Sequence, residues 1–457
     1  MKTSRPPRGT SAGNGHFQAA AQEASNAAAS WELIIALAII WGFLCVVAAY
    51  AYDIAAFLNL LAGHPVLKAL GWISFACAAL SLILLAIRTA GWFLYSPAPR
   101  ADPSSAPSLT VVIPAYNEGA MVRLSIDAAA RAEYPRDRFR IVVVDDGSRD
   151  DTWTHIQAAS AEHAGLVLPV RLAENQGKRA ALAEGFRATN AEVLVVIDSD
   201  SVIEPGALLS LAGPFRNPLV GAVSGRVSVY NEAQGIIPRL LHVNFLFIAD
   251  FFRSWESIFG TVHCCPGALM AVRASVAKAS LDEWLGQTFL GVRCAIGDDR
   301  SMTNCVLLRR FDTVYQRTAV VRTVVPATYA KLCRMLIRWN RSYIREDIRF
   351  LHKVVWRRPW RALVMLLFDR VITDIYIPVC YLSLPLILIC IESKAHLSVH
   401  FLGYIGWMSI FYVLFYLRHQ RSSSAVYAFF YPFAACSLFW IFPYAALTLK
   451  NRSWMTR

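Results

Sequence analysis

Two kinds of apolar pattern divide this chain. Between residues 105 and 350, short apolar runs of four to six residues alternate with stretches of helical periodicity, whereas long, almost uncharged apolar stretches lie on both sides of that region. Short buried runs alternating with amphipathic helices are typical of a parallel sheet covered by helices on both faces. We therefore expect an α/β domain with a mostly parallel sheet, inserted between apolar helices.

The central region gives specific element predictions. A linker rich in Pro and Ser, residues 103–108, opens it. The pattern predicts strands over 109–113, 141–144, 167–172 and 193–197, and helices over 120–132, 152–161 and 178–189.

The long apolar stretches predict membrane spans. Each is long enough to cross about 30 Å of hydrocarbon as a helix. They lie at residues 33–50, 69–87, 371–391, 401–417 and 425–449. The last contains Pro432 and Pro443, so we expect it to include a re-entrant or interfacial segment. The sequence thus predicts the following organisation: a disordered tail (1–30), two transmembrane helices (31–95), the central domain (105–350), interfacial helices (351–370), C-terminal transmembrane helices (371–450) and a short tail (451–457).

Composition supports a membrane location. The chain of 457 residues is 56% hydrophobic, with a mean hydropathy of +0.41, which is too apolar for a soluble protein of this size. Lys and Arg flank the predicted spans on the side that the positive-inside rule makes cytoplasmic. We expect a multi-pass protein of the plasma (inner) membrane with a cytoplasmic central domain. Basic residues also flank both ends of the chain, which five crossings do not allow, so the number of C-terminal spans stays open.

The net charge of +13 favours anionic ligands. It does not indicate nucleic acid, because no nucleic-acid-binding motif is present. The ten cysteines lack the spacing of a metal site and are expected to be reduced thiols. The oligomeric state cannot be inferred from the sequence.

Polar residues follow three of the predicted strands. They form the blocks Pro114–Glu118, Asp145–Ser148 and Asp198–Asp200. Ligands of open α/β sheets bind at the carboxyl ends of the strands, and two carboxylates one residue apart can hold a divalent cation that binds a diphosphate. Taken singly, the first two blocks are ordinary turns. Thr152, after the second block, is a candidate cap of the next helix.

A cation at the start of a predicted helix is the next signal. Lys178 follows Gly177 at the N-terminus of the third helix, where a positive charge is unfavourable unless an anion binds there. The sequence therefore gives equal weight to a phosphate-binding site and to an ordinary turn at this position.

Two later blocks add chemistry. In Gly297–Arg300, one acid is expected to be neutralised by Arg300 while the other serves as general base, although such a tetrapeptide alone is usually a surface turn. Arg338 and Trp339 place a flat aromatic ring among cations, which suits stacking of a sugar ring and equally an anchor at the membrane interface.

In this order, the blocks resemble those of processive family-2 glycosyltransferases, and more narrowly the hyaluronan synthase and chitin or chitooligosaccharide synthase group. The resemblance covers residues 109–350 well and the apolar stretches more loosely. The segments Phe289–Asn304 and Arg338–Glu346 are especially similar to hyaluronan synthases. The resemblance implies a GT-A-type domain that binds nucleotide sugars, with UDP-sugar donors and a growing polysaccharide acceptor.

The resemblance also implies roles for individual residues. Tyr116, Glu118, Asp145 and Asp146 would bind the uridine, and Lys178 the diphosphate. Asp198, also on the UDP-sugar, and Asp200 would hold Mg²⁺ or Mn²⁺, with Asp200 as the direct ligand. Asp299 would be the general base. Trp339 would carry the acceptor sugar, beside Arg338 near the diphosphate, and Cys265 would contact the acceptor.

The sequence departs from the family pattern at two places. The family has Gln-x-x-Arg-Trp where this chain has Met335 three residues before Arg338, which alters part of the expected lid over UDP. The segment His263–Ala268 departs from the Ser-Gly-Pro order of hyaluronan synthases at the expected acceptor site. The polymer identity therefore stays open.

Three functions compete. The first is a synthase that polymerises UDP-GlcNAc together with UDP-glucuronate, and its close alternative is a chitin-type synthase that uses UDP-GlcNAc alone. The second is a transferase that moves one sugar to a lipid carrier, which the Arg338–Trp339 and Gly297–Arg300 blocks disfavour. The third is a membrane subunit without activity, against which the retained Asp198, Asp200 and Asp299 argue.

Overall fold

The structure, a computed structural model, describes residues 65–357, 394–419 and 425–451. The predicted N-terminal tail and first span lie outside these residues, as do the predicted span 371–391, most of the interfacial segment 351–370 and residues 452–457.

The central region folds around one eight-stranded sheet with the order β3-β2-β1-β4-β7-β6-β10-β5. Four strand pairs are parallel and three, β4–β7, β6–β7 and β10–β5, are antiparallel, so the sheet is mostly parallel but mixed. The strands are β1 (Leu109–Ala115), β2 (Phe139–Asp145), β3 (Val167–Arg171), β4 (Val193–Val196), β5 (Ser201–Ile203), β6 (Val220–Val229), β7 (Met270–Arg273) and β10 (Asp312–Thr323).

Helices alternate with the strands as expected, and the four predicted strands and three predicted helices are confirmed to within a few residues. The helices of this region are α3 (Met121–Ala130), α4 (Thr152–Glu162), α5 (Lys178–Arg187), α6 (Ala207–Ala212), α7 (Ile236–Phe247), α8 (Arg253–Ile258), α9 (Ala274–Ala279), α10 (Leu281–Leu285), α11 (Asp298–Leu308) and α12 (Tyr329–Arg349). A small hairpin of β8 (Thr288–Phe289) and β9 (Val292–Arg293) precedes α11.

The two faces of the sheet bury alternate residues of each strand. Val111 and Ile113 of β1 pack in the core that contains α3 and α6, whereas Val112 packs in the core that contains α5 and α11. Successive side chains of a strand point to opposite faces, so a run of apolar residues is needed when both faces are covered. This is why the central strands show as unbroken apolar runs in the sequence.

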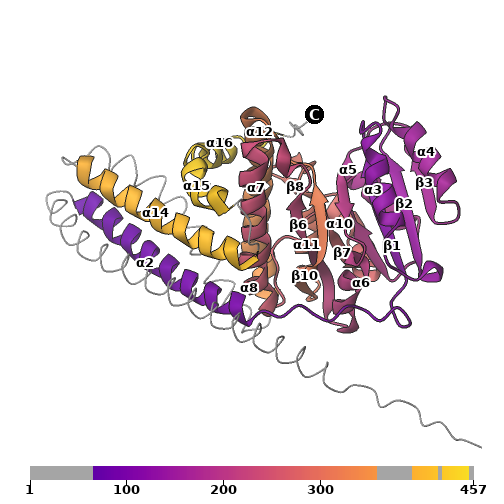
Figure 1. The fold of residues 1–457 in the computed structure, drawn as a ribbon, viewed down its shortest axis with the longest axis horizontal. Coiled ribbons are helices and arrows are strands. Elements are labelled where there is room, and N and C mark those ends of the chain that lie inside the picture. Colours follow the sequence, from indigo (N-terminus) through magenta and orange to yellow (C-terminus); the bar gives the residue numbers. More distant parts are fainter. Residues whose placement is uncertain (1–64, 358–393, 420–424, 452–457) are drawn as a thin grey trace, which may run out of the picture.

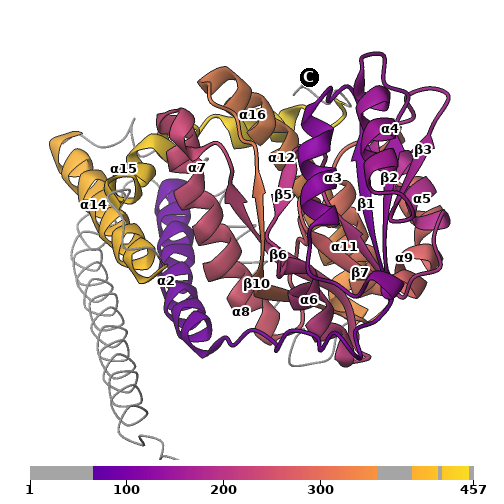
Figure 2. The ribbon, with the colours of Figure 1, turned by 45° about the vertical axis from the view of Figure 1, so that its right-hand side comes forward.

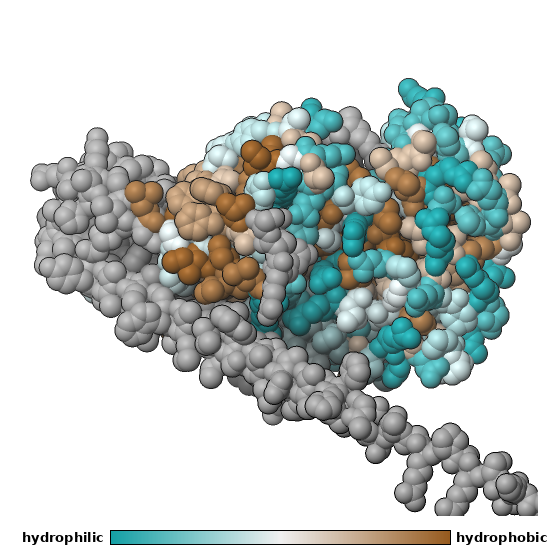
Figure 3. Space-filling view, viewed as in Figure 1, coloured by the Kyte–Doolittle hydropathy of each residue, from teal (hydrophilic) through white to brown (hydrophobic). Residues whose placement is uncertain are grey.

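Four apolar helices lie on one side of this domain (Figures 1 and 2). They are α2 (Pro65–Leu94), α14 (Lys394–His419), α15 (Ala425–Cys436) and α16 (Ile441–Leu447). Apolar surface gathers on the half of the molecule that carries them, whereas hydrophilic surface is widespread on the other half (Figure 3). Helices α2, α14 and α15 join the domain through an aromatic cluster that includes Trp92, Phe247, Phe251 and Phe415, whereas α16 packs on α12 through Ile441.

Within the described residues, no single helix combines the length and hydropathy of a membrane crossing. Helices α15 and α16 meet this criterion only as a pair, with a 45° bend between them. The stretch 425–449 is thus divided between two helices, but the break lies between Cys436 and Ile441, and Pro432 and Pro443 each lie inside one of the helices instead of at the break.

Asp250 ties the apolar helices to the sheet. It lies in a short π-helix (Ile248–Phe252) and is fully buried. Its carboxylate accepts hydrogen bonds from the Trp92 indole of α2 at 2.9 Å, from Arg317 of β10 at 2.5 Å, and from His419 of α14. Burial alone would raise the pKa of Asp250, but the His419 and Arg317 contacts outweigh it and lower the pKa to about 2.

The contact between α5 and the sheet gives a stability prediction. A Cβ at Gly185 would lie 2.3 Å from Cγ1 of Val112, which is enclosed in the core. We expect Gly185→Ala to lower the free energy of unfolding by about 1–3 kcal/mol through overpacking, despite the better helix propensity of alanine. Chemical denaturation measures this change. The matched variant Glu184→Ala, on the same helix but half-exposed, should change stability by less than about 0.5 kcal/mol. Equal effects of the two variants would contradict the close contact.

Candidate active site

The carboxyl ends of β1, β2 and β4 lie next to one another, because β1 pairs in parallel with both neighbours. The first two polar blocks are joined directly. Asn117 takes a left-handed conformation (φ 52°), and its N–H donates to the Ser148 hydroxyl at 3.0 Å. The Thr152 hydroxyl accepts from the N–H groups of Glu118 and Gly119, both at 2.8 Å. Thr152 therefore ties the two turns together, and the expectation that it caps α4 is wrong, since α4 begins at that residue.

Glu118 reaches the third block. One oxygen of its carboxylate accepts a hydrogen bond from the Ser199 hydroxyl at 2.6 Å, so Ser199 is fixed between Asp198 and Asp200. Tyr116, next along the chain from β1, is half-buried at the same edge. The end of β1 thus helps to set the conformation of the Asp198–Asp200 turn.

Asp145 ends β2 and Asp146 follows it, and the two acids have different neighbours. Asp145 is fully buried, accepts from Ser148 N–H at 3.0 Å and lies 3.1 Å from the Arg171 guanidinium. Asp146 accepts from the N–H groups of Gln176 and Gly177 at 2.8 and 2.9 Å. Burial raises the pKa of Asp146, and these two hydrogen bonds oppose the rise. Asp146 therefore shapes the turn that leads into α5.

Lys178 is the first residue of α5 and lies at the centre of the site. Its Nζ is 2.5 Å from Oδ1 of Asp198 and 3.3 Å from Oδ2 of Asp298. The charges of these acids raise the pKa of Lys178 against the opposing effect of burial. One ammonium group therefore connects the β4 turn with the start of α11.

Asp298 and Asp299 open α11 and have different surroundings. Lys178 lowers the pKa of Asp298 although burial opposes this, whereas burial and the charge of Asp298 raise the pKa of Asp299. Arg300 forms its ion pair with Asp347 of α12 and lies over the Tyr343 ring at 5.0 Å. The expectation that Arg300 neutralises one acid of its own block is therefore wrong, because Lys178 does so.

The segment before β7 packs against Asp299. Since β7 runs antiparallel to β4, the residues that precede it lie at the same edge as the Asp198–Asp200 turn. Gly267 N–H donates to Oδ2 of Asp299 at 3.3 Å, and the Cys264 sulfur lies 3.8 Å from the same oxygen. A Cβ on Gly267 would be 3.0 Å from Nζ of Lys178. A larger residue at this position would therefore press on the Lys178 ammonium group.

Cys265 has a different environment from its neighbour. Its side chain is fully buried in the core beneath α11, and its N–H donates to the Thr303 hydroxyl at 3.1 Å. Cys264, not Cys265, presents its sulfur to Asp299. The predicted acceptor contact through Cys265 is therefore not formed by an accessible side chain in this structure.

Helix α12 brings Arg338 and Trp339 to the site. Arg338 lies within electrostatic reach of Asp298, Asp198 and Asp299, whose charges raise its pKa, while burial has the larger effect and lowers it. Trp339 is partly buried and packs against Phe245, with ring centroids 5.9 Å apart. Met335, at the position where the family has Gln, is buried in the core instead of facing the site.

Asp198 and Asp200 suit a divalent cation. Asp200 accepts hydrogen bonds from Thr323 at 3.2 Å and Ser201 at 3.3 Å. Burial, then the charge of Asp198, raises its pKa to about 6, as expected where a positive charge would stabilise the pair. The described residues contain no group of three or more His, Cys, Asp or Glu side chains arranged to hold a metal. A cation here would take its other ligands from phosphate oxygens and water, which is usual for Mg²⁺.

The thiol beside Asp299 gives a test of this geometry. Burial and the nearby Asp299 carboxylate raise the pKa of Cys264, so little thiolate is present near neutral pH. We expect Asp299→Asn to speed alkylation of Cys264 by iodoacetamide about threefold or more, because the negative charge is gone. Mass spectrometry of the labelled peptide measures the rate. The exposed Asp137→Asn serves as the control, and equal rates in both variants would contradict the contact.

Comparison with known proteins places this site in a family. Residues 110–281 match the model of glycosyl transferase family 2. The chain is 35% identical over 240 residues to an N-acetylglucosaminyltransferase of Azorhizobium caulinodans, covering 52% of this chain and 60% of that protein. It is 34% identical over 269 residues to a hyaluronan synthase of Streptococcus pyogenes, covering 58% and 63%. The chain thus matches less than two thirds of the length of either relative.

The fold has a matching solved structure. A mannosyltransferase from Pyrobaculum calidifontis, in complex with GDP-Man and Mn²⁺, superimposes with a TM-score of 0.55 at 20% identity, covering 80% of this chain and 99% of that one. This likeness confirms the GT-A-like α/β fold. The match of residues 110–281 to the family model, together with the two relatives, identifies the central region as a family-2 glycosyltransferase domain.

Proposed function

We propose that this protein is a membrane-embedded, inverting and processive glycosyltransferase that polymerises UDP-sugars. Its donor would be UDP-GlcNAc, used together with UDP-glucuronate in a hyaluronan-type reaction. The observation that carries the proposal is the contact of Lys178 with both Asp198 and Asp298. This contact brings Lys178, which we expect to bind the diphosphate, next to an expected metal ligand and to the start of the helix that carries the expected base. Transfer from a nucleotide sugar requires these groups to lie together.

The donor would bind along the carboxyl edge of the sheet. Tyr116 and the Asp145–Asp146 turn line the uridine end, and Glu118 supports Ser199 between the two metal-binding acids. Lys178 and Arg338 supply positive charge for the diphosphate. Mg²⁺ or Mn²⁺ held by Asp198 and Asp200 would neutralise the charge that develops on UDP as it leaves.

Asp299 is the proposed general base. The acceptor hydroxyl attacks the anomeric carbon, its proton passes to the Asp299 carboxylate, and the bond from the carbon to UDP breaks with its electron pair going to the UDP oxygen. A single displacement inverts the configuration. The raised pKa suits a base, while the Gly267 N–H holds the carboxylate in place.

The acceptor would lie between α12 and the segment that precedes β7. Trp339, partly exposed beside Arg338, offers an aromatic face to a sugar ring. Cys264 and Gly267 border the base on the other side. The apolar helices α2, α14, α15 and α16, with the apolar stretches outside the described residues, would form the multi-pass inner-membrane part through which the polymer leaves.

Removal of the base tests the mechanism. We expect Asp299→Asn to lower sugar transfer by about 10²–10⁴-fold, because the acceptor hydroxyl loses its proton acceptor, while UDP binding is retained. Transfer is measured as polymer formed by the purified protein in lipid, and UDP binding by calorimetry. Asp137→Asn should leave both unchanged.

The pH dependence gives an independent readout for the same residue. Asp299 acts as a base only when it is ionised, so kcat should fall as the pH drops through its pKa. Because that pKa is raised, the fall should set in above the ordinary value of 3.8. Full transfer by Asp299→Asn would remove Asp299 from this role.

Donor choice tests the function as a whole. The purified protein in lipid with Mn²⁺ or Mg²⁺ is given UDP-GlcNAc alone, and then UDP-GlcNAc with UDP-glucuronate, while UDP release and polymer are measured. We expect polymer only with both donors. Polymer from UDP-GlcNAc alone would identify a chitin-type synthase, and transfer of single sugars to a polyprenyl phosphate would identify a lipid-carrier enzyme. No turnover with either donor would contradict the proposal.

A further inference from the structure

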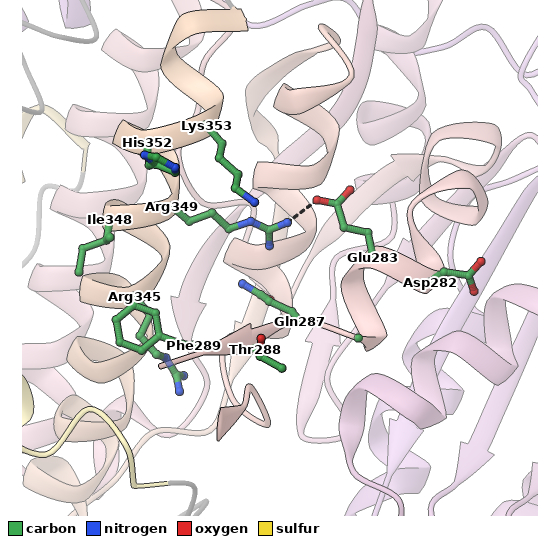
Figure 4. A pocket seen from close by; sticks show the side chains of 11 residues that line it. Asp282, Glu283, Gln287, Thr288, Phe289, Arg345, Ile348, Arg349, His352 and Lys353 are labelled. Carbon is green, nitrogen blue, oxygen red and sulfur yellow. Dashed lines mark hydrogen bonds and ion pairs between the residues drawn. The ribbon is translucent and has the colours of Figure 1, made fainter. Parts of the chain in front are cut away.

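A hollow of about 460 Å³ lies between α10, the β8–β9 hairpin and the C-terminal end of α12, which supply residues that line it. The chain continues past α12 into a short π-helix (Phe350–Val354), which supplies the upper lining in Figure 4. None of the residues assigned above to donor, metal or acceptor lines this hollow. It therefore needs an explanation of its own.

The wall formed by α12 contains a buried cation that forms no ion pair with the other described residues. Arg345 is 5% exposed, and its guanidinium donates one hydrogen bond, to the Ile296 carbonyl at 3.1 Å. Across the described residues, no carboxylate lies within ion-pair distance of it. Burial lowers the pKa of Arg345, and the neighbouring Cys294 and Glu346 side chains oppose this effect. A buried guanidinium is costly without a counter-ion.

The wall also contains a buried carboxylate, which already accepts hydrogen bonds from other side chains. Glu346, 2% exposed, accepts hydrogen bonds from the Gln287 amide and from Asn304 Nδ2 at 2.8 Å. Its other ion contact is with Arg349 at 3.9 Å. Glu346 therefore offsets part of the Arg345 charge electrostatically but forms no ion pair with it in the described part of the chain.

The rim of the hollow adds to the positive charge. Arg349 lies 2.5 Å from Glu283, and the side chain of Lys353 points toward the same guanidinium (Figure 4). Lys353 is exposed and makes no ion pair or hydrogen bond within the described part of the chain. The carboxylate of Asp282 turns away from the cations in Figure 4. Of the two acids on α10, Glu283 is therefore the one that faces these cations.

We propose that this hollow binds the phosphoryl group of a phosphate ester. The Arg349 and Lys353 head groups lie together at the hollow, Arg345 lines it from one turn earlier in α12, and a phosphate offers enough acceptor oxygens to meet several such donors. The volume exceeds that of a phosphate ion, so the group would belong to a larger molecule. Two sources share this chemistry, a soluble phosphate ester and the headgroup of an anionic phospholipid.

The proposed site is connected to the base by direct contacts. The Gln287 side-chain oxygen accepts from Arg179 at 2.8 Å and from the Ser301 hydroxyl of α11 at 2.5 Å. Arg345 holds the Ile296 carbonyl, two residues before Asp298. A bound phosphate would therefore contact two of the side chains that hold the start of α11 in place.

The test measures anion-specific stabilisation of the full-length protein in neutral phosphatidylcholine nanodiscs. The thermal midpoint is followed while inorganic phosphate replaces chloride at constant ionic strength. The midpoint should rise for the wild type. Lys353→Gln should weaken the apparent phosphate affinity about tenfold, because one charge-assisted bond is lost. Glu283→Gln should strengthen it, because the internal competitor for Arg349 is removed.

The control variant is Lys331→Gln, which removes an exposed lysine at the start of α12 and should behave as the wild type. Each variant is compared with its own midpoint in chloride, so that a change in basal stability does not enter the result. Equal phosphate responses of Lys353→Gln and Lys331→Gln would overturn the proposal, as would the absence of any phosphate-specific response in the wild type.

A second arm separates the two sources. The same four proteins are placed in nanodiscs that contain phosphatidylglycerol, without added phosphate. A midpoint rise that is lost in Lys353→Gln and kept in Lys331→Gln would assign the site to a lipid headgroup. A response to free phosphate alone, with the same dependence on Lys353, would assign it to a soluble phosphate ester.

Discussion

The site depends on the ammonium group of Lys178, which lies among several carboxylates. Asp198, Asp200, Asp298 and Asp299 gather at one edge of the sheet, and their mutual repulsion would separate the two segments that carry them. Lys178 contacts the first and third of these acids and offsets part of that repulsion. The result is an uneven distribution of charge, in which Asp298 is stabilised as an anion and Asp299 is pushed toward protonation.

Much of this arrangement could be predicted from the sequence. The central strands are buried on both faces, so their unbroken apolar runs locate them, and the polar residues after each run then fall at one edge. Asp198 and Lys178 meet because the parallel strands that precede them share that edge, whereas Asp298 and Asp299 open α11, which follows the separate β8–β9 hairpin. The mixed part of the sheet was harder to foresee, since β6 and β10 show bulges and alternating burial that no short motif marks.

The partners of individual side chains could not be predicted, because they depend on packing between distant segments. Arg300 follows two acids in the chain, yet α11 turns it toward Asp347. Cys264 and Cys265 are adjacent and chemically identical, and only the direction of the backbone before β7 decides which one faces Asp299. Glycine gives a weak signal of such contacts. Gly267 and Gly297 both stand where a Cβ would meet the neighbouring side chain, and both adjoin the base.

The buried Asp250 has a consequence for how the protein can be divided. Two of its three hydrogen-bond donors, Trp92 and His419, belong to the apolar helices, and only Arg317 belongs to the sheet. A fragment containing the transferase domain alone would lose both donors and expose Phe247 and Phe251 to water. The catalytic and apolar parts are therefore joined by a buried polar contact as well as by an aromatic cluster, and both contacts cross the domain boundary suggested by the sequence.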